Sequence, residues 1–97
     1  MSAVKAAKRI ARAVDARAEA SETKITRLKM STKSIAEISE VDVLTPQFME
    51  ALQDACLQQG WASFQISTSY YAFIQLESAL KFRQMSASRL IECLDNN

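Results

Sequence analysis

The sequence predicts a mostly helical α+β protein, and three observations lead to that prediction. The chain has 97 residues, which is enough for one domain with a modest core. It contains one glycine and one proline, and this scarcity of turn-forming residues favours helices over a sheet-rich fold. The stretch 61–76 alternates apolar and other side chains in the way that strands do. We therefore expect a single domain over residues 1–97, with an N-terminal helix, a helix–helix–hairpin unit and a C-terminal helix.

Residues 1–20 predict a basic, alanine-rich helix, because alanine is the strongest helix former. Apolar side chains spaced three or four residues apart form one thin stripe, suited to close packing against another helix or to a homodimer. The stripe comprises Val4, Ala7, Ala11, Val14 and Ala18. Four cations on another face form the first candidate partner-binding surface: Lys5, Lys8, Arg9 and Arg12. Their like charges indicate an acidic counterpart, either nucleic acid, a partner or this chain's own acidic half.

The next segment predicts two short helices. Ser21 ends the first helix, and residues 22–30 are interpreted as a second helix with three inward side chains. Ser31 or Thr32 then caps a third helix over residues 33–39. The side chains that the second helix sends to the core are Ile25, Leu28 and Met30.

Thr45 and Pro46 are the clearest local signal in the chain. Threonine is a good N-cap and proline suits the first helical position, so a longer helix begins here and ends near Gly60. Its inward face comprises Phe48, Met49, Leu52, Ala55 and Cys56. Its outward face provides the second candidate partner-binding surface, whose residues are Glu50, Gln53, Asp54 and Leu57.

Residues 61–76 predict a β-hairpin that turns at the small polar residues 67–69. Both faces of its second strand hold large apolar groups. These either meet the N-terminal helix or form the third candidate partner-binding surface, made of Tyr70, Tyr71 and Phe73. Residues 79–85 fit a third strand or the start of a helix. Ser86 or Ser88 then caps a final helix with apolar residues Leu90, Ile91 and Leu94.

Residues 22–76 resemble the winged-helix family in the order of their elements, through "STKSIAEIS" followed by "LTPQFMEALQDACLQQGW". The family usually has glycine in the turn between these helices, where this chain has Glu40. The resemblance implies DNA binding, but the outward face of the long helix carries Glu50 and Asp54 and no cation. The hairpin tip also lacks lysine and arginine, so this face lacks the electrostatic attraction that supplies most DNA affinity.

The net charge of +1 hides two halves of opposite sign. Residues 1–33 carry nine basic and three acidic side chains, which gives +6, and residues 34–97 carry three basic and eight acidic ones, which gives −5. The basic half is suited to lying along phosphates without reading bases. The acidic half is suited to a protein partner.

The composition gives catalysis no support. The chain has no histidine, the commonest general base, and a single glycine leaves no Gly-rich phosphate loop. Cys56 and Cys93 lack metal-site spacing and are expected to be small buried side chains. We expect no cofactor and no metal. No apolar run approaches the ~20 residues of a membrane span, and no signal peptide is visible, so we expect a cytoplasmic protein without membrane contact.

These observations predict a non-enzymatic binding protein that acts through protein–protein contacts. In size and style it resembles the small inhibitor proteins of phages and mobile elements. The resemblance implies a host or cellular protein as partner, and an acidic face indicates a partner that handles nucleic acid. The alternative is a DNA-binding transcriptional regulator that uses the basic N-terminal segment and a winged helix-turn-helix.

Overall fold

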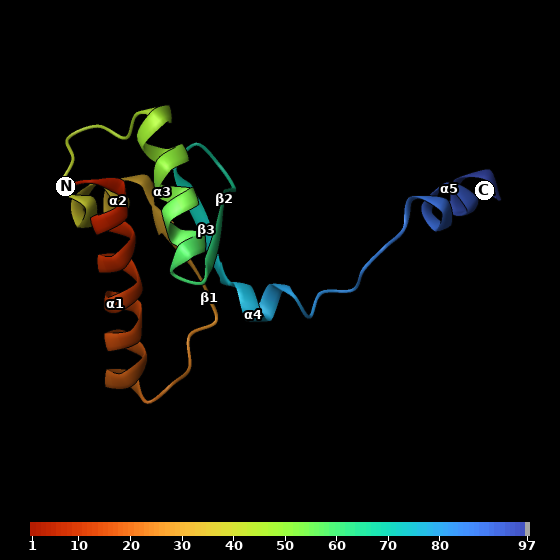
Figure 1. Ribbon diagram of the computed structural model, residues 1–97. Coiled ribbons are helices and arrows are strands. Elements are labelled where there is room, and N and C mark those ends of the chain that lie inside the picture. Colours follow the sequence, from red (N-terminus) through yellow and green to blue (C-terminus); the bar gives the residue numbers. More distant parts are fainter. Residues whose placement is uncertain (97) are drawn as a thin grey trace.

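The computed structural model describes residues 1–96 as an α+β fold in which helices cover one face of a small antiparallel sheet (Figure 1). This part of the chain confirms the predicted fold class, with long N-terminal and shorter C-terminal helices. In chain order the elements are α1 (Ala3–Ser21), β1 (Arg27–Ser31), α2 (Thr32–Ser39), α3 (Pro46–Gln58), β2 (Trp61–Gln65), β3 (Tyr70–Gln75), α4 (Leu76–Ala79) and α5 (Ala87–Asp95).

Hydroxyl side chains begin four of these helices. Each hydroxyl accepts a hydrogen bond from the backbone N–H three residues further on, which satisfies one free donor of the first helical turn. The capping residues are Ser2, Ser31, Thr45 and Ser86. Pro46 also occupies the first turn of α3. The predicted starts of α2, α3 and α5 are therefore confirmed.

A residue with left-handed backbone conformation follows each of the helices α1, α2 and α3. Glu22 and Glu40 have φ values of 53° at the C-caps of α1 and α2, and Gly60 has φ of 85° one residue beyond Gln59, the C-cap of α3. Gly60 adopts this conformation without steric cost, as predicted for the stop of the long helix. Its carbonyl accepts a hydrogen bond from the Leu76 N–H, which ties the end of α3 to the end of the hairpin.

The prediction of a helix over residues 22–30 is wrong. Residues 27–31 form β1, which pairs antiparallel with β3 so that Leu28 lies opposite Phe73 and Met30 opposite Tyr71. The sheet order is β1-β3-β2. The hairpin alone would leave one edge of β3 without hydrogen-bond partners, and β1 fills that edge. Residues 79–85, which fitted a strand or a helix, include only the end of α4 before an irregular connection.

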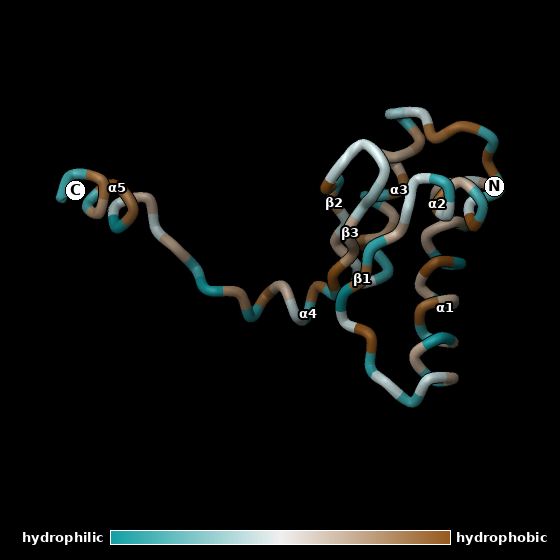
Figure 2. The backbone as a smooth tube through the Cα atoms, turned by 180° about the vertical axis from the view of Figure 1, so that it is seen from behind, coloured by the Kyte–Doolittle hydropathy of each residue, from teal (hydrophilic) through white to brown (hydrophobic). Residues whose placement is uncertain are grey.

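The two faces of the sheet have different environments. Leu28, Met30, Tyr71 and Phe73 share the inner face, where they pack with the core beneath α1 and α3. Figure 2 views the body from the opposite side, with the strands in front of α3, and no helix covers this outer face. We call the outer face the open sheet face. Its residues are Arg27, Lys29, Ala62, Phe64, Tyr70, Ala72 and Ile74.

The core forms where α1 crosses α3 and where both meet the sheet. Ala6 and Ala7 are almost fully buried, and their small side chains allow the two helices to approach closely. The predicted stripe of α1 is confirmed at Ala7, Ala11, Val14 and Ala18, which are buried or partly buried. It is wrong at Val4, which is 56% exposed, and it omits the buried Ile10. Phe73, with 2% exposure, is the largest fully buried side chain on the sheet.

Residues 80–96 extend away from this packed body, and we call them the C-terminal arm (Figure 1). Every residue of the arm is exposed. The radius of gyration is 16.3 Å, whereas a compact chain of this length has a value of about 12.5 Å. The predicted final helix is thus present as α5, but it stands apart from the core.

Candidate interaction surfaces

The acidic face of α3, which consists of Glu50, Asp54 and Leu57, lies in solvent as predicted. Both carboxylates are exposed, and Leu57 is 44% exposed beside them. In residues 1–96 the single ion pair joins Arg9 to Glu40, so neither Glu50 nor Asp54 has an ion-pair partner there. Because they are four residues apart on one helix, they lie about 6 Å from each other and repel. A complementary cationic surface would relieve that repulsion.

Gln53 does not belong to this surface, although its position on the helix predicted so. Its side-chain Nε2 donates a hydrogen bond to the Ser63 carbonyl oxygen at 3.2 Å, and the side chain is partly buried. The residue therefore fixes α3 against β2. The helix that carries Glu50 and Asp54 is thus joined to the sheet by this hydrogen bond.

The basic face of α1 is exposed at all four predicted positions. Arg9 donates from Nη1 to Glu40 Oε1 at 2.8 Å, and this ion pair links α1 to the C-cap of α2. Both side chains are about half exposed, so the pair contributes no more than about 1 kcal/mol. The other cations of the face border a shallow hollow beside Met1, and they are Lys5, Lys8 and Arg12.

The aromatic set of β3 does not form one surface. Phe73 is buried in the core and unavailable to a partner. Tyr71 shares the inner face with Phe73 and is half-buried there, whereas Tyr70 is 40% exposed on the outer face. Successive side chains of a strand point to opposite faces, which separates Tyr70 from Tyr71. Of the two alternatives, packing against the body therefore holds for Phe73, and the three residues do not share one exposed surface.

The open sheet face is an apolar surface with a basic rim that the sequence did not predict. Phe64 on the edge strand β2 is 52% exposed, opposite Ala72 and near Ile74 of the central strand β3. Arg27 and Lys29 border the same shallow hollow from β1. The Lys29 ammonium lies 4.8 Å from the centre of the Tyr70 ring, within the range of a cation–π contact.

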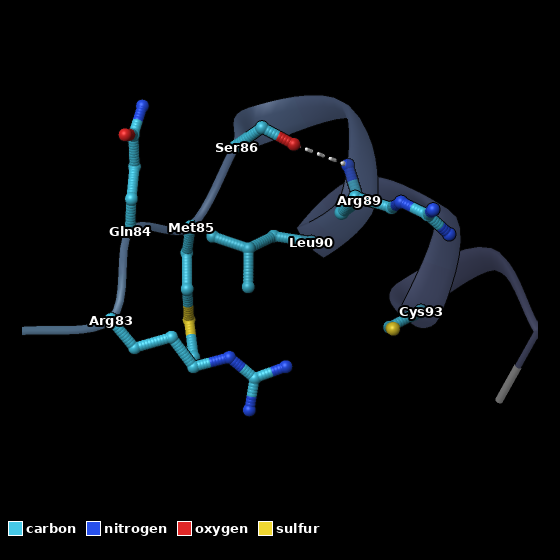
Figure 3. A pocket seen from close by; sticks show the side chains of 7 residues that line it. All are labelled: Arg83, Gln84, Met85, Ser86, Arg89, Leu90 and Cys93. Carbon is cyan, nitrogen blue, oxygen red and sulfur yellow. Dashed lines mark hydrogen bonds between the residues drawn. The ribbon is translucent and has the colours of Figure 1, made fainter.

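The C-terminal arm carries the second unpredicted apolar surface. Its exposed apolar residues are Leu80, Phe82, Met85, Leu90, Ile91 and Leu94. Ser86 caps α5 by accepting a hydrogen bond from the Arg89 N–H at 3.4 Å, and Leu90 points toward Met85 across that cap (Figure 3). These positions correspond to a hydrophobic staple, which fixes the direction in which the chain enters the helix. The arm therefore has local order, and of the residues that line the hollow beside Phe64 and Ile74 only Phe82 comes from the arm.

The two cysteines lie in opposite environments. Cys56 is 1% exposed in the core, and burial raises the pKa of its thiol to about 11. It is therefore protonated at neutral pH and unsuited to act as a nucleophile. Cys93 is exposed on α5, so the prediction that both are buried is wrong for this residue.

Residues 1–96 contain neither a cluster of metal ligands nor a helix able to span a membrane. No three side chains of histidine, cysteine, aspartate or glutamate gather closely enough in this region to hold a metal ion. Among the helices described there, none combines the length and hydrophobicity that crossing a bilayer requires.

Comparisons with known proteins add no relative. No protein-family model, curated protein sequence or solved structure matches the chain. The surfaces described above are therefore interpreted from their own geometry and chemistry.

Proposed function

We propose that this protein is a small, non-enzymatic binding protein that inhibits or modulates a nucleic-acid-handling protein through direct contact. One observation carries the proposal: Glu50 and Asp54 lie in solvent on one face of α3, and neither has an ion-pair partner within residues 1–96. Paired carboxylates on a rigid helix present two negative charges at a fixed spacing. A basic site that normally holds phosphates is complementary to such a surface.

The packing of α3 supports this role. Met49, Leu52 and Cys56 anchor the opposite side of the helix in the core, and Gln53 is bonded to β2. The acidic face therefore loses little conformational freedom when it binds, which favours affinity. Leu57 adds exposed apolar area one turn after the carboxylates. Charges would select the partner and speed association, while apolar contact would slow dissociation.

The test is capture of the partner from a cell lysate with immobilised protein. Glu50→Lys plus Asp54→Lys should abolish recovery of a partner that wild-type protein retains, because both charges of the acidic face are reversed. Glu19→Lys plus Glu77→Lys is the matched control, since it makes the same change in net charge at exposed sites elsewhere. Duplex DNA added in excess should displace the partner. Equal recovery by the two double variants would exclude the acidic face as the interface.

A second candidate function is DNA binding through α1, as in a transcriptional regulator. Lys5, Lys8 and Arg12 favour it, because these exposed cations have no ion-pair partner in residues 1–96. The order helix, helix and hairpin over residues 32–75 also supports the resemblance to winged-helix domains. Against it, α3 presents carboxylates where such domains read bases, and the β2–β3 turn has no cation.

A gel shift with random duplex DNA at two salt concentrations tests this alternative. Lys8→Glu plus Arg12→Glu should remove a salt-sensitive shift, because each lost phosphate contact also lowers the salt dependence. These two positions avoid Arg9, whose change would also break the ion pair with Glu40. Lys81→Glu plus Arg83→Glu serves as the charge-matched control on the arm. The absence of any shift at low salt would leave the protein-partner proposal in place.

A further inference from the structure

We propose that two copies of this chain exchange their C-terminal arms, so that α5 of each copy covers the open sheet face of the other. Both surfaces are apolar and uncovered in a single copy. Phe64 on the sheet is 52% exposed, and Ile91 and Leu94 on α5 are 56% and 75% exposed. Proteins in water rarely leave two such surfaces uncovered, because the burial of apolar surface is favourable in free energy.

The shapes of the two surfaces agree. Ala87, Leu90, Ile91 and Leu94 fall on one side of α5 at the spacing of helical turns, which makes one continuous apolar stripe. A helix of nine residues is about 14 Å long. The six residues of β3 span about 20 Å, so the helix fits within the length of the open sheet face.

The charges also agree. Asp95 lies on one flank of the apolar stripe of α5, whereas Glu92 and Arg89 both lie on the side of the helix opposite the stripe. The basic rim of the open sheet face comes from one edge strand, through Arg27 and Lys29. The flank of α5 that carries Asp95 therefore belongs over β1. This arrangement fixes the rotation of the docked helix as well as its position.

The course of the arm indicates that a second copy provides the cover. Phe82 borders the hollow that contains Phe64 and Ile74, so the arm starts at the edge of the open sheet face. From there the chain runs outward and carries α5 away from its own sheet (Figure 1). A second copy offers the same open face and the same uncovered arm. In a two-fold symmetric exchange both arms and both open sheet faces are covered, since the contact between α5 and the sheet is made twice.

This dimer is compatible with the proposed function and independent of it. The acidic face of α3 lies on the other side of the sheet from the open sheet face. Exchange of arms therefore leaves Glu50 and Asp54 accessible to a partner. A dimerisation assay contains no other protein, so its outcome says nothing for or against the inhibitor proposal.

Sedimentation analysis of the full chain tests the exchange. Wild-type protein at about 100 μM should be dimeric, and Phe64→Glu or Leu94→Glu should each weaken dimerisation by at least about tenfold, because a carboxylate would have to be buried. Val43→Glu is the matched control, since Val43 is 71% exposed in the loop before α3, far in sequence from both surfaces. Leu94 lies on the exposed arm, so its substitution leaves the folded body intact.

Mixing the two variants distinguishes exchange from folding of the arm onto its own sheet. The Leu94→Glu copy retains an intact open sheet face, and the Phe64→Glu copy retains an intact arm. In an exchanged dimer one of the two contacts can then form, so the mixture should associate more strongly than either variant alone. A monomeric wild type, or a mixture no stronger than its components, would overturn the proposal.

Discussion

At the scale of single residues, position along the chain is a poor guide to environment. Tyr70, Tyr71 and Phe73 are near neighbours in sequence, yet one faces solvent and another is in the core. Cys56 and Cys93 both lie on helices and are each followed by a leucine, but only Cys56 is buried. The burial of Cys56 has a consequence for the pH dependence of stability that can be measured.

Cys56 should make the protein less stable at high pH. Its thiol has a pKa of about 11 in the folded protein and 9.0 as its ordinary value, so the folded chain holds this proton more tightly. The resulting stabilisation is complete below pH 9.0 and is lost as pH rises toward about 11. The difference in free energy of unfolding between wild type and Cys56→Ala, measured by urea unfolding, should therefore be smaller at about pH 11 than at about pH 8. An advantage that is constant between the two pH values would contradict this account.

At the scale of elements, β1 shows how pairing overrides local preference. Residues 22–30 contain side chains compatible with a helix, but the free edge of β3 offers backbone partners that a helix does not. In the strand, Leu28 points to the core and Arg27 to solvent. The alternation of Arg27, Leu28, Lys29 and Met30 was the available sequence signal for this strand, and it is too short to identify a strand by itself.

Alanine substitutions at neighbouring positions test the strand. Leu28→Ala should lower the free energy of unfolding by about 1 to 2 kcal/mol, less than for a fully buried leucine because Leu28 is half-buried. Arg27→Ala should change it by less than about 0.5 kcal/mol, since this side chain is exposed. Denaturant titration of both variants provides the comparison. Equal losses would mean that the two side chains do not point to opposite faces.

At the scale of the whole molecule, the two oppositely charged halves of the chain neutralise each other little. In residues 1–96 one ion pair, between Arg9 and Glu40, joins the basic first third to the acidic remainder. The other cations of α1 and the carboxylates of α3 thus remain available as separate surfaces. The arm is likewise separate from the packed body, which accounts for the large radius of gyration.

Removal of the arm should leave the body folded. A chain that ends at Ala79 should differ from the Leu94→Glu variant by less than about 0.5 kcal/mol in the free energy of unfolding, because no arm residue is buried. Its radius of gyration should fall to about 12 Å, which small-angle scattering can measure. The Leu94→Glu variant is the proper reference, since exchange of arms is weakened in it and impossible in the shortened chain. A large loss of stability would show that the arm packs on the body.

Much of the fold follows from signals that act within a few residues. Ser31, Thr45 and Ser86 cap helices because each hydroxyl bonds a backbone N–H three residues away. The exposure of Glu50 and Asp54 follows from the period of the helix that carries them. The same helical period predicts that Gln53 faces solvent, but its side chain is hydrogen-bonded to β2. Nothing in the sequence around Gln53 indicates the Ser63 carbonyl that it contacts.

The sequence by itself determined the fold class, the starts of three helices, the solvent-facing charges and the absence of histidine. The tertiary structure alone decided that residues 27–31 form a strand, that Phe73 is core while Phe64 is surface, and that α5 lies away from the body. The physical reason is the separation along the chain of the groups that interact. Caps and helical periods depend on neighbours along the chain, whereas strand pairing and burial depend on groups that meet only after folding.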